Sequence, residues 1–355
     1  MIVFVVGAGA TLAEALPGHP RQAEKPPLDA SFFSLCERAK LEGAFTLRRY
    51  LDSNYGINPF AGEARMEEVF NIVYADTFSD SSSADGIDAY WALLKMYHSA
   101  IRLTTNPLTG TSRAGVGALL RFFARRGEED FVFVTFNQDL LIEKAIDAAK
   151  RTSRYSHLSW DIWSAYRIKF AKDAHLPRGV RKPFHAQLPT PTRSIGVLKL
   201  HGSMNWVYPV RSAEDAKNAL RSPSRDLTLL NEQRILSKMV DRSGKRAKPS
   251  LPFVVPPIYG KSSLIRDVLQ PVWKQARDAV QEADELIIFG YSCPDADQDA
   301  RNMISNAFHR NTKTDHVHII DPSPAASGRV GSLLRAPVVT RYATAGAFID
   351  HYQSA

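Results

Sequence analysis

Cysteine is scarce in this chain, and its scarcity argues against two ways of stabilising a fold. Only two of the 355 residues are cysteine, Cys36 and Cys293, and they form no Cys-x-x-Cys pair. A thiolate zinc site is excluded, because such a site takes its ligands from paired cysteines. A disulfide framework is not expected either. This favours a reducing compartment, and we expect a cytoplasmic protein.

Long apolar runs are missing as well. No stretch of the sequence approaches the roughly 20 apolar residues that span a bilayer. The N-terminus is apolar, but it lacks a basic leader and is interrupted by Glu14. It therefore predicts a first strand and a helix rather than a signal peptide, and we expect no membrane association.

Acidic residues are in mild deficit. The chain has 45 Lys and Arg against 37 Asp and Glu, which gives a net charge of +8. This charge suits a nucleotide, a nucleic acid or an acidic partner and does not choose among them. The densest basic cluster, residues 242–248, has no interleaved aromatic residues, so we expect a solvated loop there. Direct nucleic-acid binding stays open.

The sequence does contain five short apolar runs, each followed or ended by a polar residue or glycine. They are residues 2–6, 131–135, 195–200, 285–289 and 316–320. Long stretches with helical spacing separate them. This alternation predicts an α/β fold with a doubly wound, Rossmann-like parallel sheet. In such a sheet, ligands bind outside the carboxyl ends of the strands.

The gaps between these runs predict the domain organisation. We expect one domain over residues 1–355, with a helical insertion over 30–127 and smaller insertions over 151–194 and 207–250. Helical spacing within the first insertion covers residues 32–41, 66–74, 89–101 and 116–125, and residues 79–86 form a loop. Residues 322–355 are expected to form only a short tail.

The first strand leads into Gly7-Ala-Gly-Ala-Thr11. Glycines let the backbone approach a pyrophosphate, and a helix N-terminus supplies unpaired N–H groups. The match to the dinucleotide fingerprint is partial, because Leu12 stands where a third glycine is required. The alternative is a tight strand-to-helix turn without a ligand.

Two further strand ends carry groups suited to general-base chemistry. Phe136-Asn-Gln-Asp139 follows the second strand. Asn137 or Asp139 can cap the next helix, which the spacing favours, or Asn137 can orient a water or a ribose hydroxyl. His201 lies between the third apolar run and Gly202. Most histidines are structural, but one at a cleft can act as a general base.

The last two strand ends supply polar and acidic groups. In the segment 290–299, Gly290 and Ser292 suit a phosphate or ribose contact. The aspartates at 295, 297 and 299 are expected to cap the next helix and favour its dipole, with a divalent metal site as the alternative. Asp321 can bind ribose hydroxyls, or it is a turn residue before Pro322.

In this order the segments resemble the sirtuin-like superfamily. Residues 7–11 are similar to its Gly-Ala-Gly-x-Ser, residues 135–139 to its Thr-x-Asn-x-Asp, residues 200–202 to its catalytic His-Gly, and residues 290–292 to its late Gly-Thr-Ser. Asp321 occupies the place of the adenosine-side strand end. The resemblance covers residues 1 to about 325.

The closer likeness is to the bacterial sirtuin-like defence proteins. Residues 26–33, 199–206 and 289–292 are similar to segments of that branch. Its members hydrolyse NAD and deplete the cell of it during phage infection, which is an abortive-infection defence. The four-cysteine zinc module of protein-deacylating sirtuins is missing here, and this argues against deacylation.

The resemblance implies the roles of individual residues in an NAD glycohydrolase. Asn137 and His201 would be the catalytic pair, and Asp139 would contact the nicotinamide carboxamide. NAD would be the substrate, and no metal ion is expected. The other implied NAD-binding residues are Gly7, Ala8, Gly9 and Thr11 at the phosphates, Gly290, Tyr291, Ser292 and Asp321 at the adenosine side, and Asp29 in a cofactor loop.

Alternative functions stay open. One is a sirtuin-type deacylase or ADP-ribosyltransferase, and another is a non-catalytic nucleotide-sensing subunit. A free NAD hydrolase would kill its host, and residues 322–355 leave no room for a large fused sensor. We therefore expect restraint by homo-oligomerisation or by a separate, helicase-like ATPase subunit.

Overall fold

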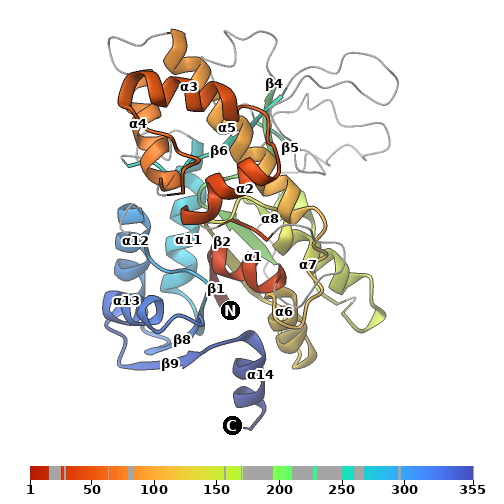
Figure 1. The fold of residues 1–355 in the computed structure, drawn as a ribbon. Helices are drawn as coiled ribbons and strands as arrows, with labels where there is room; N and C mark the ends of the chain where they lie inside the picture. The colour runs from red at the N-terminus through yellow and green to blue at the C-terminus, as the bar shows by residue number, and fades with distance from the viewer. Residues whose placement is uncertain are drawn as a thin grey trace.

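A six-stranded sheet forms the centre of the structure, and every neighbouring pair of its strands is parallel (Figure 1). The computed structural model describes residues 1–15, 25–27, 29–62, 64–78, 84–155, 157–168, 170, 195–209, 227–229, 250–259, 268–294 and 297–354. In spatial order the strands are β3 (Gly196–Lys199), β2 (Phe131–Thr135), β1 (Ile2–Val6), β7 (Glu285–Phe289), β8 (His316–Ile320) and β9 (Val338–Tyr342). The expected α/β, Rossmann-like fold is confirmed.

The five apolar runs predicted as strands are β1, β2, β3, β7 and β8. Every residue of β1 and β2 is buried, because helices cover the sheet. Phe4 of β1 stacks on Phe133 of β2 at 4.9 Å between ring centroids and meets the edge of Phe123 at 5.9 Å. Such apolar runs, buried on both faces, are typical of parallel sheets.

The strand order reverses beside β1. The chain passes from β1 outward to β2 and β3, and then returns to the other side of β1 with β7, β8 and β9. Flanking helices contact one another in two groups. One group is α6 (Val116–Arg125), α7 (Leu141–Lys150) and α14 (Ala345–Ser354), and the other is α11 (Gln270–Gln281), α12 (Gln298–His309) and α13 (Pro324–Leu334). The switch point between β1 and β7 is where a sheet of this kind binds ligands.

Four helices between β1 and β2 build a second hydrophobic core. They are α2 (Phe32–Arg38), α3 (Ala44–Tyr55), α4 (Met66–Phe78) and α5 (Ala84–Thr105), and we call them the helical module. Their buried side chains, among them Leu47, Phe70 and Leu93, form a cluster distinct from that of the sheet. In Figure 1 the module lies above the parallel sheet.

The helical insertion was expected over residues 30–127, but its last helix belongs elsewhere. Helix α6 places Leu119 and Phe123 in the core of the sheet and contacts α7 and α14. The helices with a core of their own therefore end at α5. Helix α3 was not expected, and its apolar side chains Leu47 and Leu51 are both fully buried in the module.

A small antiparallel sheet was not expected. It consists of β5 (Thr228–Leu229), β4 (Gly202–Pro209) and β6 (Ser250–Val254), in that order. Strand β4 carries the fully buried Trp206 into the main core. Residues 210–226 and 230–249 of the expected 207–250 insertion, including the basic cluster 242–248, lie outside the described residues. So do residues 171–194 of the 151–194 insertion and most of the 79–86 loop.

The expectation of a short tail over residues 322–355 was wrong. This segment contains α13, the edge strand β9 and α14. The strand escaped detection because most of β9 is only partly buried, so Thr340 and Arg341 interrupt its apolar pattern. Within the part of the chain that the structure describes, no helix has the length and apolarity needed to cross a membrane.

Candidate functional site

A cavity of about 770 Å³ opens at the carboxyl ends of β1, β2, β7 and β8. Its size lies within the range of small-molecule sites, roughly 300–1,000 Å³. The helical module contributes part of the wall through Tyr97, Ile101 and Thr104 of α5. Every residue that the sequence suggested for the site lines this one cavity: Gly7, Ala8, Gly9, Thr11, Asp29, Asn137, Asp139, His201, Gly290, Tyr291, Ser292 and Asp321.

The glycine-rich turn after β1 packs against the turn after β7. The Gly7 N–H donates to the Phe289 carbonyl at 3.0 Å, and the Gly9 N–H donates to the Gly290 carbonyl at 2.9 Å. Gly290 has φ +62°, and a Cβ there would lie 2.2 Å from the Ala10 nitrogen. The glycines therefore permit contact between two stretches of backbone. Among the described residues, the Ala8 N–H has no backbone acceptor, and Ala8 lines the cavity.

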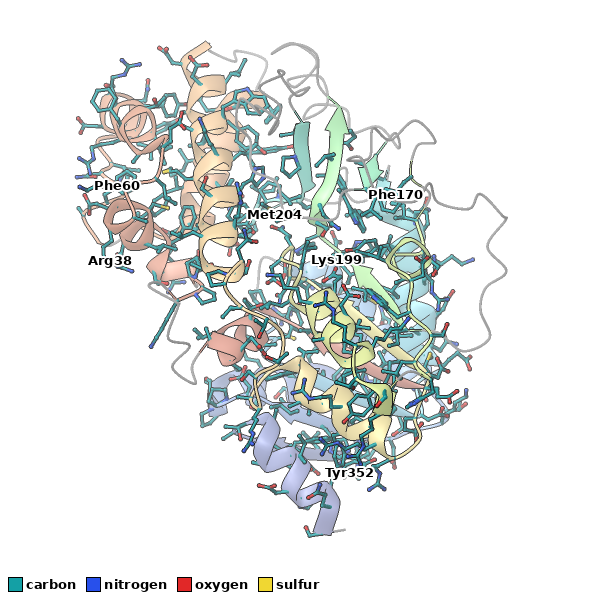
Figure 2. All side chains as sticks on the ribbon, turned by 90° about the vertical axis from the view of Figure 1, so that its right-hand side faces the viewer. Arg38, Phe60, Phe170, Lys199, Met204 and Tyr352 are labelled. Atoms are coloured by element: carbon teal, nitrogen blue, oxygen red, sulfur yellow. The ribbon has the colours of Figure 1, made fainter. Side chains whose placement is uncertain are left out.

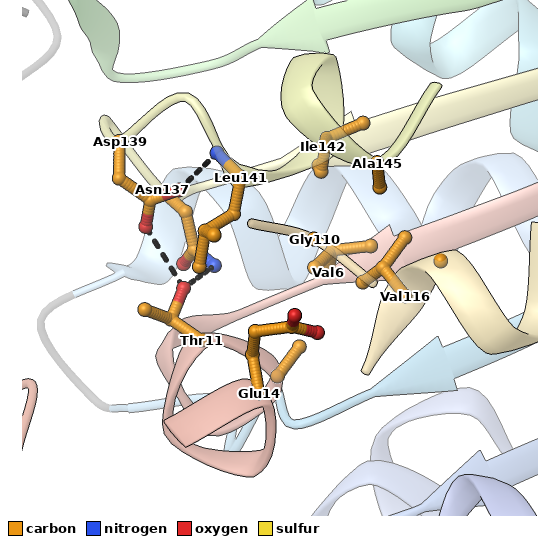
Figure 3. Close-up of a pocket in the computed structure, with 12 residues that line it drawn as sticks. Val6, Thr11, Glu14, Gly110, Val116, Asn137, Asp139, Leu141, Ile142 and Ala145 are labelled. Carbon is orange, nitrogen blue, oxygen red and sulfur yellow. Dashed lines mark hydrogen bonds between the residues drawn. The ribbon is translucent and has the colours of Figure 1, made fainter. Parts of the chain in front are cut away.

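Asn137, Thr11 and Asp139 form a chain of hydrogen bonds (Figure 3). The Asn137 Nδ2 donates to the Gly7 carbonyl at 2.8 Å and to the Thr11 Oγ1 at 3.0 Å. The Thr11 hydroxyl donates in turn to the Asp139 Oδ2 at 2.8 Å. Because a carbonyl only accepts, these bonds orient the Asn137 amide and leave its Oδ1 to accept from a ligand or a water.

The structure separates the two roles that the sequence left open for this segment. The Asp139 Oδ1 accepts from the Leu141 N–H at 2.9 Å, so Asp139 supports the start of α7 and Asn137 does not. The Thr11 hydroxyl proton is already donated, which leaves the oxygen only as an acceptor toward other groups. The Asp139 carboxylate has accepted two of its four possible hydrogen bonds and can accept more.

A buried ion pair lies directly behind this loop. Lys199 of β3, labelled in Figure 2, is fully buried. Its Nζ lies 3.1 Å from the Glu143 Oε1 of α7. The same Nζ donates to the backbone carbonyls of Asp139 and Asn137. The Glu143 Oε1 also accepts from the Tyr166 hydroxyl at 2.7 Å, and burial raises the pKa of Tyr166 well above its ordinary value.

Sequence reasoning missed Lys199, which was read as part of an apolar run. The available signal was a lysine within the apolar run 195–200, since a fully buried lysine requires a partner. Lys199 stabilises the loop after β2, because its one ammonium group binds the carbonyl groups of both Asn137 and Asp139.

His201 lies in the tight connection between β3 and β4. His201 is 7% exposed, and its ring packs edge-to-face with the Phe136 ring, with 5.4 Å between the ring centroids. Gly202 has φ +75°, and a Cβ there would lie 2.2 Å from the Phe253 carbonyl oxygen, so only glycine allows this turn beside β6. The chain reversal places the His201 side chain in the cavity wall.

The aspartate cluster before α12 supplies a partner for His201. The Asp297 Oδ1 lies 4.0 Å from the His201 Nε2, and both side chains are 9% exposed. Asp297 occupies the N-cap position of α12 but makes no side-chain capping bond, which corrects the expectation that it caps this helix. Asp299 lies in the first turn of α12 as expected, and Asp295 lies outside the described residues. The described residues contain no group of histidine, cysteine and carboxylate side chains arranged for a metal ion.

The remaining predicted residues have structural contacts of their own. The Asp321 Oδ1 accepts from the Ser323 N–H at 2.8 Å, as a turn residue would. The Asp29 Oδ1 accepts from the Glu67 N–H at 2.9 Å, in the first turn of α4. The Tyr291 ring stacks on Phe136 with 4.3 Å between centroids. All three line the cavity, but these contacts alone do not require a ligand.

Tyr97 connects the helical module to the polar end of the cavity. Burial raises the pKa of its hydroxyl; the Gln138 amide opposes this rise, and the charges of Asp297 and Asp139 add to it. Both carboxylates therefore act on the same region of the cavity. The end of α5 is held in place by Lys144 of α7, whose Nζ donates to the Thr105 carbonyl at 3.0 Å.

Together these groups define what this end of the cavity can do. The imidazole of His201 can accept a proton, and the Asn137 Oδ1 can accept a hydrogen bond. The carboxylates of Asp139 and Asp297 favour a positively charged group nearby. This combination suits cleavage of a bond in which positive charge develops.

The fold and the cavity define a Rossmann-like α/β protein with a cavity of small-molecule size at its switch point. Comparison with protein-family models gives no matching family, and a search of curated proteins gives no matching relative.

Proposed function

We propose that the chain is an NAD⁺ glycohydrolase. It would cleave the bond between nicotinamide and ribose, converting NAD⁺ and water into nicotinamide, ADP-ribose and a proton. The observation that carries this proposal is the convergence of Asn137, His201 and the turn between β1 and helix α1 (Ala8–Ala15) on one cavity at the switch point.

The carboxylates fit the charge changes of this reaction. The nicotinamide ring of NAD⁺ is cationic and leaves as a neutral molecule, so no strong general acid is required. The ribose passes through a state resembling an oxocarbenium ion. The negative charges of Asp139 and Asp297 both raise the pKa of the Tyr97 hydroxyl in the cavity wall. They would stabilise positive charge on the nicotinamide ring and then on the ribose.

Asn137 and His201 would control the attacking water. The Asn137 amide is held by Gly7 and Thr11, so its Oδ1 can accept a hydrogen bond from the water in a fixed direction. His201 would accept the proton that the water loses on forming the new C–O bond, and Asp297 at 4.0 Å would stabilise the resulting imidazolium. Neutral nicotinamide is a good leaving group, and the proposed route needs neither a metal ion nor a redox step.

The proposed cellular role follows the resemblance to bacterial sirtuin-like defence proteins. Depletion of NAD in the cytoplasm would stop phage replication at the cost of the infected cell. Such an activity needs restraint, which we assign to homo-oligomerisation or to a separate, helicase-like ATPase subunit.

The test is nicotinamide release from NAD⁺ by the purified chain, followed by chromatography of both products. We expect His201→Ala to slow release about 10²–10⁴-fold, the range for loss of a general base, and Asn137→Ala to slow it strongly. His309→Ala and Asn306→Ala are matched controls on α12 that lie outside the cavity lining, and they should keep full activity.

Two results would contradict the proposal. Binding of intact NAD⁺ without nicotinamide release, also in the presence of candidate ATPase subunits, would favour a nucleotide-sensing subunit. Release that depends on an acyl-lysine peptide and transfers the acyl group to ADP-ribose would favour a deacylase.

A further inference from the structure

We propose that Arg329 of α13 is the residue that binds the diphosphate of the dinucleotide. This inference rests on the proposed function only in taking a nucleotide diphosphate as the ligand, and it does not require that NAD⁺ be cleaved. Arg329 was not among the residues that the sequence suggested for the site.

The position of Arg329 is set by the turn that follows β7. Its Nε donates to the Ser292 carbonyl at 3.1 Å, and the side chain lines the cavity while remaining exposed. The Nη groups have no acceptor among the described residues. A guanidinium anchored through Nε presents its Nη hydrogens in a planar fork, which matches two oxygens of a phosphate.

The charge of the cavity makes this residue necessary. Among the described residues that line it, Arg329 is the sole lysine or arginine. The carboxylates that line the same cavity are those of Asp29, Glu67, Asp139, Asp297 and Asp321. A diphosphate would be repelled by these groups, so the place where it can bind is beside the guanidinium.

The glycine-rich turn does not remove this need. Its N–H groups at Gly7, Gly9 and Ala10 donate to backbone carbonyls of the two packed turns. The turn therefore offers the Ala8 N–H and the positive end of α1, which are weak compared with a full charge. Two further helix N-termini line the same cavity, through Ser323 and Ala326 of the α13 start and Thr344 and Ala345 of the α14 start.

Asp321 indicates that Arg329 binds the diphosphate and not a phosphate on the adenosine ribose. Its carboxylate lines the same end of the cavity and is held by the Ser323 N–H. A carboxylate there accepts from ribose hydroxyls and repels a 2′-phosphate. Arg329 is therefore assigned to the diphosphate.

The experiment is titration calorimetry of the full chain with ADP-ribose, which has the diphosphate but no bond to cleave, and with adenosine 2′-monophosphate. Arg329→Ala should weaken ADP-ribose binding about 10- to 100-fold, the range for a hydrogen bond to a charged group. Arg329→Lys should restore part of the loss. Arg310→Ala, an exposed arginine at the end of α12, is the matched control and should bind as the parent chain does.

Salt provides the readout that a purely structural role would not change. The affinity of the parent chain for ADP-ribose should fall as ionic strength rises, and Arg329→Ala should reduce that dependence. Thermal unfolding of each variant confirms that the fold is retained.

Three results would overturn the proposal: unchanged ADP-ribose affinity in Arg329→Ala, a parent chain that does not bind ADP-ribose, and a larger loss for adenosine 2′-monophosphate than for ADP-ribose. Nicotinamide release is measured separately on the same preparations. Arg329-dependent ADP-ribose binding without NAD⁺ cleavage, also in the presence of candidate ATPase subunits, would support this inference and contradict the glycohydrolase.

Discussion

The ion pair between Lys199 and Glu143 gives a stability prediction whose size follows from the contacts. Lys199→Met removes a cation that is fully buried and leaves the Glu143 carboxylate in the interior, where its Oε2 already has no partner among the described residues. Breaking a buried pair from one side costs about 3–5 kcal/mol. The Asp139 carbonyl also loses its donor, which adds about 1–3 kcal/mol.

The expected total is therefore about 4–8 kcal/mol, a large part of the roughly 5–15 kcal/mol that stabilises a folded protein. Glu143→Leu alone should also be costly, since it leaves the Lys199 ammonium unpaired. The double variant removes both charges and should recover part of the loss, leaving about 1–3 kcal/mol each for the Asp139 carbonyl and the Tyr166 hydroxyl, which lose their partners.

The assay is urea unfolding followed by tryptophan fluorescence, arranged as a double-mutant cycle. A coupling energy of at least about 3 kcal/mol is expected from the buried pair. Lys313→Met, which breaks an exposed pair with Glu282, is the control and should barely move the midpoint. Additive effects of the two core substitutions, or a loss below about 1 kcal/mol for Lys199→Met, would refute the reasoning.

Two further outcomes are expected from the same unfolding assay. Gly290→Ala should lower the free energy of unfolding by about 3 kcal/mol or more, because φ is +62° and the new Cβ meets the Ala10 nitrogen. Gly127→Ala, with φ +88° and open space around the new Cβ, is the control and should cost only about 1–2 kcal/mol. Equal losses would contradict the contact at the switch point. Burial lowers the pKa of His98 from 6.5 to about 3. Between these two pH values the unfolded chain binds a proton on His98 that the folded chain does not, so stability is lost as the pH falls from 6.5 toward 3. The His98 contribution at pH 5 should be about 2 kcal/mol relative to pH 7. The parent chain should therefore lose about 2 kcal/mol more than His98→Leu over this range, and an identical pH dependence of the two proteins would rule this out.

Much of the sheet could be predicted because its signal is local. The runs of β1, β2, β7 and β8 end at the residues where the apolar pattern ends. A strand buried on both faces must be apolar throughout, so its bounds are visible without knowledge of its neighbours. Strand β9 lacks this requirement at the edge of the sheet, and it was missed for that reason.

The candidate site was predictable to the extent that it follows strand ends. Asn137, His201 and Gly290 each follow an apolar run, and the parallel sheet brings such positions to one edge. The sequence offered Asp139 as one of two possible helix caps but did not show that Asp29 supports the start of α4, and it could not separate a cap from a ligand contact, since both use the same residue types.

By itself, the sequence determined which segments become buried strands and which polar residues stand at their carboxyl ends, because both depend on neighbours along the chain. The tertiary structure decided the strand order and the partners: Lys199 with Glu143, His201 with Asp297, and Arg329 with the turn after β7. The sequence around a charged side chain does not indicate which group that side chain will contact. The contact depends on how elements distant in the sequence pack together. Here the packing of helices around one parallel sheet brings these groups to the switch point or directly behind it.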